Sequence, residues 1–152
     1  MSSNLARLMA TFFYMGYIPV APGTSASLVG MFFYLIFCQN MVAYVAVFAV
    51  VLFLGFLASD LAEQSIGEKD PSCIVIDEVS GVMIAFFMLP FSWPVVFTGF
   101  FLFRAFDMFK IYPVNKFEPL PGGVGVMMDD IVAGLYTNVT MHLALWLAVF
   151  IR

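Results

Sequence analysis

The segment that decides this fold reads FRAFDMFK at residues 103–110 and, after a proline-containing loop, GGVGVMMDDIVAG at residues 122–134. Only 11% of the chain is charged and 63% is hydrophobic, so an arginine, a lysine and three aspartates beside long apolar runs are unusual. Ionisable groups at or within a membrane boundary are costly to bury and usually serve a function. We therefore interpret this segment as half of an active site.

The composition predicts a polytopic membrane protein. The chain has 152 residues, which suits a single domain over residues 1–152, and its mean hydropathy is +1.02. With six Lys plus Arg and a net charge of −4, it has no basic surface for nucleic acid. The N-terminus lacks a basic region followed by a cleavage site, so we expect no cleaved signal peptide. Cys38 and Cys73 form neither a CxxC pair nor a zinc pattern.

The N-terminal quarter predicts a short helix and a break. Residues 4–18 are apolar but marginal in length for a membrane span, which favours an interfacial or re-entrant helix. Residues 16–27 contain two prolines, and Thr24 or Ser27 is expected to cap the helix that follows. The backbone N–H groups at that helix N-terminus are also able to hold a phosphate, which makes Thr24 a candidate binding residue.

Apolar helices are expected through most of the remaining chain. Residues 28–38 and 41–59 predict a helical hairpin, residues 94–106 a returning span, and residues 126–151 a last helix. His142 lies well inside the last of these, where a packing role is expected because the acidic residues lie a span's length away.

Two adjacent acids mark the helix predicted over residues 71–89. Asp70 and Pro71 are typical of an N-cap followed by the first helical position. Asp77 and Glu78 lie in the second turn among aliphatic residues, where two ionised carboxylates without a cation would be costly. An interfacial pair favoured by the helix dipole is the alternative, but we favour a functional role.

A second group of charges follows the returning span. Arg104, Asp107 and Lys110 recur every three residues and so share a broad helix face. A surface ion pair with a snorkelling lysine is the alternative interpretation. Asp129 and Asp130 then form a second acidic doublet after a glycine cluster that permits close backbone approach.

The turns predict four or five membrane crossings. They place Arg7, residues 60–78 and residues 104–130 on one face, which then carries five of the six basic residues. An excess of Lys and Arg marks the cytoplasmic side. Both acidic doublets are therefore expected to meet at the cytoplasmic surface, with Cys38 and Cys73 too far apart for a disulfide.

Carboxylate pairs from two helices suit a divalent cation with oxygen ligands. Mg²⁺ takes one or two carboxylates together with substrate phosphate oxygens, and it can bridge a phosphoryl group and activate water. The predicted metal-binding and catalytic residues are Asp77, Glu78, Asp129 and Asp130, with Asp70 as a further metal ligand. The predicted phosphate-binding residues are Arg104, Lys110, Asp107, Thr24 and Gly123. Among them, Asp107 is expected to orient the basic side chains of Arg104 and Lys110. A cation transporter or channel is the alternative, but its carboxylates should then follow a path through the membrane.

With these residues assembled, the chain resembles the phosphatidylglycerophosphatase A family. Three blocks carry the likeness: PVAPGT at residues 19–24; Asp70 with IVIDE at residues 74–78 and Gly81; and Phe103, Arg104, Asp107, Lys110, Pro113, GGVG at residues 122–125 and DDIVAG at residues 129–134. The resemblance implies an all-α multihelical bundle in the bacterial inner membrane, multi-pass, with its active site facing the cytoplasm. It also implies a phosphoric monoester hydrolase that uses Mg²⁺ to convert phosphatidylglycerophosphate to phosphatidylglycerol and phosphate.

The chain departs from the family pattern at three points, none of which touches the acidic doublets. Ala26 precedes Ser27 where the family usually has glycine, Ile111 follows Lys110 where proline is typical, and Glu118 replaces a common aspartate. Two routes stay open for the hydrolysis, direct attack by water and a phospho-enzyme on an aspartate.

Overall fold

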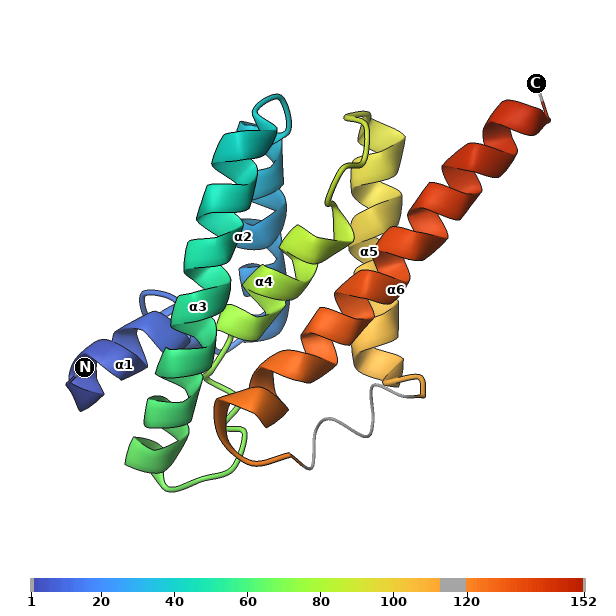
Figure 1. The fold of residues 1–152 in the computed structure, drawn as a ribbon. Coiled ribbons are helices and arrows are strands. Elements are labelled where there is room, and N and C mark those ends of the chain that lie inside the picture. Colours follow the sequence, from blue (N-terminus) through green and yellow to red (C-terminus); the bar gives the residue numbers. More distant parts are fainter. Residues whose placement is uncertain (1, 113–119, 152) are drawn as a thin grey trace.

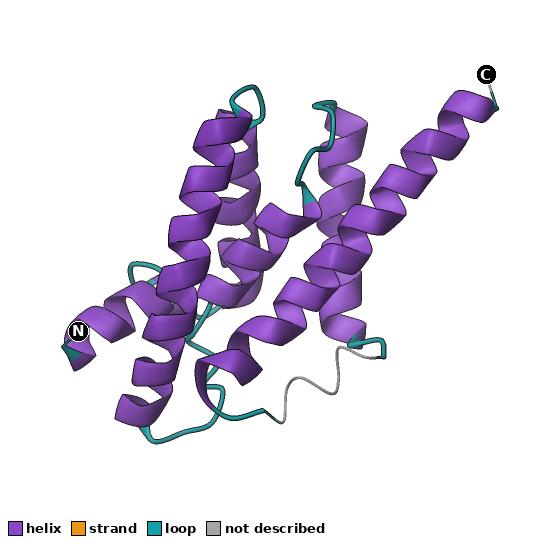
Figure 2. Cartoon of the chain, in the orientation of Figure 1, coloured by secondary structure: helices purple, strands orange, loops and turns teal. Residues whose placement is uncertain are grey.

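The computed structural model describes residues 2–112 and 120–151 of the chain, so Pro113, Lys116 and Glu118 lie outside the described residues. Every regular element within these ranges is a helix, and Figure 2 shows the helices joined by loops. The elements are α1 (Ser3–Ala10), the 3₁₀ helix η1 (Met15–Tyr17), α2 (Pro22–Phe37), α3 (Met41–Ile66), α4 (Ile76–Ala85), α5 (Trp93–Phe109) and α6 (Gly122–Phe150). The predicted all-α fold is confirmed.

The N-terminal segment is a short helix packed against α3. The Arg7 side chain on α1 donates to the side-chain oxygen of Ser65 at 2.8 Å and to its carbonyl oxygen at 2.6 Å. Ser65 lies in the last turn of α3, where carbonyl groups lack partners within the helix. Arg7 therefore ties the N-terminus to the C-terminal end of α3.

The predicted N-caps of the second helix are wrong. α2 begins at Pro22 and its N-cap is Ala21, which has a φ of +50°. Proline is favoured at the first helical position because its missing N–H would have no partner there and its φ is already helical. Thr24 and Ser27 consequently lie inside the first two turns of α2 rather than before it.

The helical hairpin is present, but its second helix is longer than predicted. Asn40 caps α3 by accepting from the Ala43 N–H at 3.1 Å, and the helix runs to Ile66 instead of ending near Ser59. Several residues after Ser59 are good helix formers, namely Leu61, Ala62, Glu63 and Gln64. The helix ends only at Gly67, whose φ of +77° is the left-handed conformation that terminates many helices.

The helix predicted over residues 71–89 is wrong in length and in its cap. α4 covers only Ile76–Ala85, a rise of about 15 Å, which is too short to cross a bilayer. Asp70 does not cap it and instead adopts a φ of +46°, while the N-cap is Val75. Eight of the ten residues of α4 are buried, so the helix forms the centre of the bundle against α2, α3 and α6.

The last helix begins four residues earlier than predicted and packs closely on α4. The Gly123 N–H in its first turn donates to Asp60 Oδ1 on α3 at 3.4 Å, so α3 supplies the cap that Pro121 lacks. Further along, a Cβ on Gly81 would lie 2.7 Å from the Asp130 carbonyl oxygen, and one on Gly134 would overlap the Gly81 carbonyl. These glycines allow the backbones of α4 and α6 to touch.

α3 and α6 are each long and apolar enough to cross a membrane, and they are the two candidate spans in the described part of the chain. α4 is too short to cross a bilayer as a single helix, so residues 71–89 do not form the predicted helical span. The number of crossings stays a prediction. Cys38 and Cys73 are both free thiols, as expected. His142 is exposed on α6, with its ring Nε2 3.3 Å from the Phe87 carbonyl oxygen.

The bundle gathers one set of helix ends together. In Figure 1 the first turns of α2, α4 and α6 and the last turns of α3 and α5 lie at the lower end. The α2–α3 turn, the loop before α5 and the C-terminus lie at the other end. Both acidic doublets and the Arg104–Lys110 segment are on elements that meet at this lower end.

Candidate active site

A cavity of about 360 Å³ opens where these helix ends meet. Its acidic lining residues are Asp70, Asp77, Glu78, Asp107, Asp129 and Asp130, and its basic lining residues are Arg104 and Lys110. The first turn of α2, from Ala21 to Thr24, completes one wall. A larger groove of about 450 Å³ lies between α1, α2 and α3, but its walls are entirely apolar and offer no group for chemistry.

Three carboxylates from two helices form the acidic centre of the cavity. Asp77, Glu78 and Asp130 each offer an oxygen, and these oxygens lie within 4.8 Å of one another. Asp77 and Asp130 are only 8% and 3% exposed. One oxygen of each of the three (Oδ1 of Asp77, Oε2 of Glu78 and Oδ1 of Asp130) is buried without a hydrogen-bond partner among the described residues. Buried oxygens with no partner are costly unless something else satisfies them.

The pKa values of the first acidic doublet, Asp77 and Glu78, also indicate that a cation would be stabilising here. Burial, followed by the neighbouring Glu78 and Asp130 carboxylates, raises the pKa of Asp77 well above its usual range. Burial also raises the pKa of Glu78 to about 6, even though the nearby Arg104 opposes the shift. The fold therefore holds acids where their charged forms are disfavoured. A divalent cation with oxygen ligands fits this donor set because it neutralises the charge and satisfies the unpartnered oxygens.

Asp129 has a different environment from its neighbour Asp130. Its Oδ2 accepts from Lys110 Nζ at 3.1 Å, and its Oδ1 accepts from the Asp130 N–H at 3.0 Å. Successive residues on an α-helix point about 100° apart, so the two aspartates of the doublet face different partners. The structure thus brings Asp129 into the cavity as the partner of Lys110, outside the group of three carboxylates.

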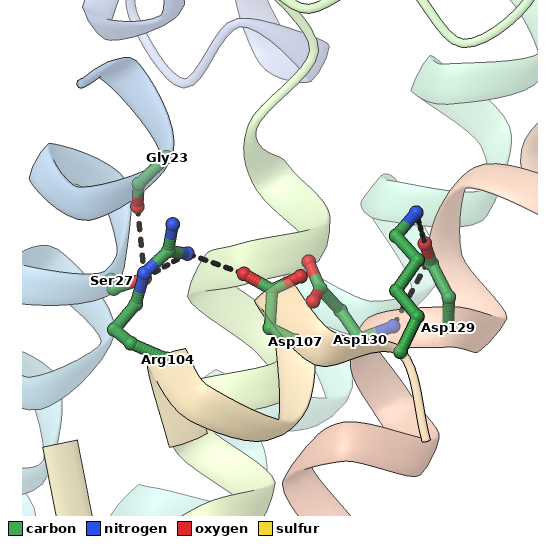
Figure 3. A network of polar contacts seen from close by, with 7 residues as sticks. Gly23, Ser27, Arg104, Asp107, Asp129 and Asp130 are labelled. Carbon is green, nitrogen blue, oxygen red and sulfur yellow. Dashed lines mark hydrogen bonds and ion pairs between the residues drawn. The ribbon is translucent and has the colours of Figure 1, made fainter. Parts of the chain in front are cut away.

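Arg104 lies on the side of the cavity opposite Lys110, and its side chain contacts residues of α5 and α2. Its Nη1 lies 2.6 Å from Asp107 Oδ2 on α5 and donates to Ser27 Oγ on α2 at 3.4 Å. Ser27 in turn donates to the Gly23 carbonyl at 2.8 Å. Figure 3 shows this chain of contacts from Gly23 to Asp107, with the Asp107 and Asp130 carboxyl groups next to each other.

Of the other predicted site residues, two line the cavity and one does not. Thr24 and Asp70 line the cavity, but Asp70 is not part of the group of three carboxylates. Gly123 does not line it; a Cβ there would overlap the Phe56 carbonyl oxygen, so the glycine serves packing against α3.

Two residues of the site were missed by the sequence reasoning. A Cβ on Gly23 would overlap Glu78 Oε1, so its hydrogen leaves room for that acid beside α2. Ser27, one turn later, is fully buried beside Arg104. The available signal was their spacing of four, which places two small residues on one face of α2.

Relatives of known name match most of this chain. The sequence profile of the family described as Phosphatidylglycerophosphatase A matches residues 8–145. A protein of that name from Escherichia coli (strain K12) is 36% identical, with 88% of this chain and 79% of that protein covered. Another from Haemophilus influenzae is 34% identical, with coverages of 91% and 87%. A Bacteroides thetaiotaomicron protein named "Putative phosphatidylinositol-3-phosphatase" is 38% identical, with coverages of 95% and 96%.

No solved structure matches the chain. The family match covers most of the described helices, including both acidic doublets and Arg104. This favours an enzyme over the alternative of a carboxylate-lined cation path. The chain therefore belongs to the phosphatidylglycerophosphatase A family of lipid phosphatases.

Proposed function

We propose that this chain is a Mg²⁺-dependent phosphatase that hydrolyses phosphatidylglycerophosphate to phosphatidylglycerol and phosphate. The observation that carries the proposal is the cavity itself. It holds three carboxylates, each with one oxygen that has no partner in the described part of the chain, together with the basic side chains of Arg104 and Lys110. The name of the E. coli and H. influenzae relatives gives the substrate.

Asp77, Glu78 and Asp130 are the proposed metal ligands. Each offers an oxygen within 4.8 Å of the others, and one oxygen of each has no hydrogen-bond partner among the described residues. A divalent cation bound there would offset the acidic charge that otherwise repels a phosphate and would polarise the phosphoryl group. Asp70 and Asp129 line the same cavity, where they add negative charge close to the ion.

Arg104 and Lys110 are the proposed phosphate-binding residues. The planar guanidinium of Arg104 can hold two phosphate oxygens at once, whereas the Lys110 ammonium acts as a point charge. Asp107 orients Arg104 through the 2.6 Å ion pair, and Asp129 orients Lys110 at 3.1 Å. The first turn of α2, with Thr24, adds backbone N–H groups to the same wall.

The reaction breaks the ester bond between phosphorus and the terminal glycerol oxygen. Water supplies the oxygen that the phosphate gains, and its proton goes to the glycerol oxygen that leaves. Rapid-quench trapping of labelled phosphate on the protein distinguishes direct attack by water from a phospho-enzyme on one of the aspartates.

The positions of the basic residues support the location that we propose. The protein spans the bacterial inner membrane several times, and its active site faces the cytoplasm. Arg7 is bonded to the end of α3, Lys69 follows that end, and Arg104 and Lys110 line the cavity. Basic residues concentrated at one end of a helical bundle indicate the cytoplasmic side.

Phosphate release from phosphatidylglycerophosphate in detergent micelles, with Mg²⁺ and with chelator, tests the proposal. We expect release with Mg²⁺, none with chelator, and none from Asp77→Asn protein that still folds. Release that is unaffected by chelator, or near-normal turnover by Asp77→Asn, would contradict the metal assignment. Phosphatidylinositol 3-phosphate belongs in the same assay because one relative is named for it; faster turnover of that lipid would replace the proposed substrate.

A further inference from the structure

Ser27 is a buried hydroxyl that connects the backbone of one helix to the arginine of another. It lies on α2 with no exposed surface. Its Oγ donates to the Gly23 carbonyl at 2.8 Å and accepts from Arg104 Nη1 on α5 at 3.4 Å. Because the hydroxyl proton is used toward Gly23, an oxygen lone pair is left to face the guanidinium (Figure 3).

This contact differs in kind from the ion pair that also holds Arg104. Asp107 is three residues from Arg104 on the same helix, so that ion pair by itself does not tie the guanidinium to another helix. Ser27 belongs to α2, whose first turn forms the neighbouring wall. Arg104 also lies near Glu78. Both side chains reach Gly23 of α2: a Cβ built there would overlap Glu78 Oε1 and would lie 3.5 Å from Arg104 Nη1.

We propose that Ser27 is a positioning residue that aims the Arg104 guanidinium at the substrate phosphate by tying it to the first turns of α2. The inference rests on the proposed function, in which Arg104 binds that phosphate. Arginine recognises phosphate through a planar fork, so its affinity depends on direction as well as on distance.

A helical serine often bonds to the carbonyl four residues earlier without any further role. Ser25 does so here, with its Oγ donating to the Ala21 carbonyl at 3.3 Å. Arg104 is not among the hydrogen-bond partners of Ser25 in the described part of the chain. Ser25→Ala is therefore a matched control, because it removes the same kind of bond from the same helix and leaves Arg104 untouched.

The test compares Ser27→Ala, Ser25→Ala and the wild type in phosphate release from phosphatidylglycerophosphate at saturating Mg²⁺. For Ser27→Ala we expect KM to rise about three- to tenfold, the effect of one hydrogen bond of ordinary strength, with kcat changed less than about twofold. The Mg²⁺ concentration for half-maximal activity should not change. Ser25→Ala should behave as wild type.

A double-mutant cycle with Arg104→Lys asks whether Ser27 acts through the guanidinium. In the Arg104→Lys background, Ser27→Ala should change kcat/KM by less than about twofold, because the group that it positions is gone. Full additivity of the two changes would overturn the proposal. So would an equal rise in KM for Ser25→Ala, or an unchanged KM for Ser27→Ala.

Ser27→Cys repeats the test if the alanine variant fails to fold, because a thiol nearly keeps the size of the side chain but is a weak acceptor. Loss of folded protein in both variants would assign the hydroxyl to stability and overturn the positioning role. The outcomes remain distinct from those of the proposed function: a wild type that releases no phosphate from phosphatidylglycerophosphate contradicts that function, whereas an active wild type with a silent Ser27→Ala contradicts only this inference.

Discussion

Replacing Asp130 by asparagine should make the metal-free protein more stable while removing its activity. Asp130 lies in the group of three carboxylates, and one of its oxygens is buried without a partner. Without a cation, the substitution removes a like charge and offers an amide donor to the remaining acids. With a cation, it removes a ligand, so phosphate release should fall by at least about 100-fold.

The spacing of the oxygens sets the size of the stability effect. At the 4.8 Å limit of the group, two unit charges in an effective dielectric of about 20 repel by about 3.5 kcal/mol. The effect on stability is smaller than this Coulomb energy, because the acids bind protons to relieve the repulsion. A gain of about 1–2 kcal/mol corresponds to a rise in melting temperature of about 2–8 °C for a chain of this size.

The assay is thermal unfolding in detergent, with chelator and with excess Mg²⁺. Wild-type protein should melt higher with Mg²⁺ because an ion bound only to the folded state stabilises it, and Asp130→Asn should lose most of that shift. Asp129→Asn is the matched control: it weakens the ion pair with Lys110 and should not raise the melting temperature in chelator. The reasoning fails if Asp130→Asn melts below wild type in chelator or keeps the full Mg²⁺ shift.

Three further predictions follow from the same site. Arg104→Lys keeps the charge but loses the fork, so kcat/KM should fall about 10- to 100-fold while the Mg²⁺ shift in melting temperature persists; an unchanged kcat/KM would remove Arg104 from phosphate binding. Burial raises the pKa of Glu78 from 4.5 to about 6 and that of Asp77 in the same direction, so their protonated forms favour folding. The metal-free protein should therefore be most stable near pH 4.5 and lose stability as the pH rises through about 6, and a melting temperature in chelator that is flat over this range would be inconsistent. Gly81→Ala places a Cβ 2.7 Å from the Asp130 carbonyl oxygen and should cost about 1–3 kcal/mol, measured as a lower melting temperature with or without Mg²⁺.

Much of the helix content could be predicted from the apolar runs, but the helix limits could not. Asp70 followed by Pro71 is a good local signal for a helix start, yet α4 begins only at Ile76. The intervening segment is held by the end of α1 instead, where the Val75 N–H donates to the Ala10 carbonyl at 3.0 Å. A contact between segments more than sixty residues apart overrides the local preference, and no short window of sequence contains it.

The start of α6 shows the same limit. Glycines at residues 122 and 123 favour a loop when considered alone. In the fold, Asp60 on α3 accepts the Gly123 N–H and satisfies one of the unpaired donors of the first turn. The helix therefore begins earlier than its own residues indicate.

By itself the sequence determined the chemical class of this protein: an apolar helical chain, two acidic doublets, a recurring set of charges and a likeness to a lipid phosphatase family. Only the tertiary structure decided how the second doublet is divided. Asp130 faces the carboxylates of α4, whereas Asp129 faces Lys110. The reason is geometric: adjacent residues in a chain are equivalent until the helix that carries them packs against its neighbours, which gives each side chain its own surroundings.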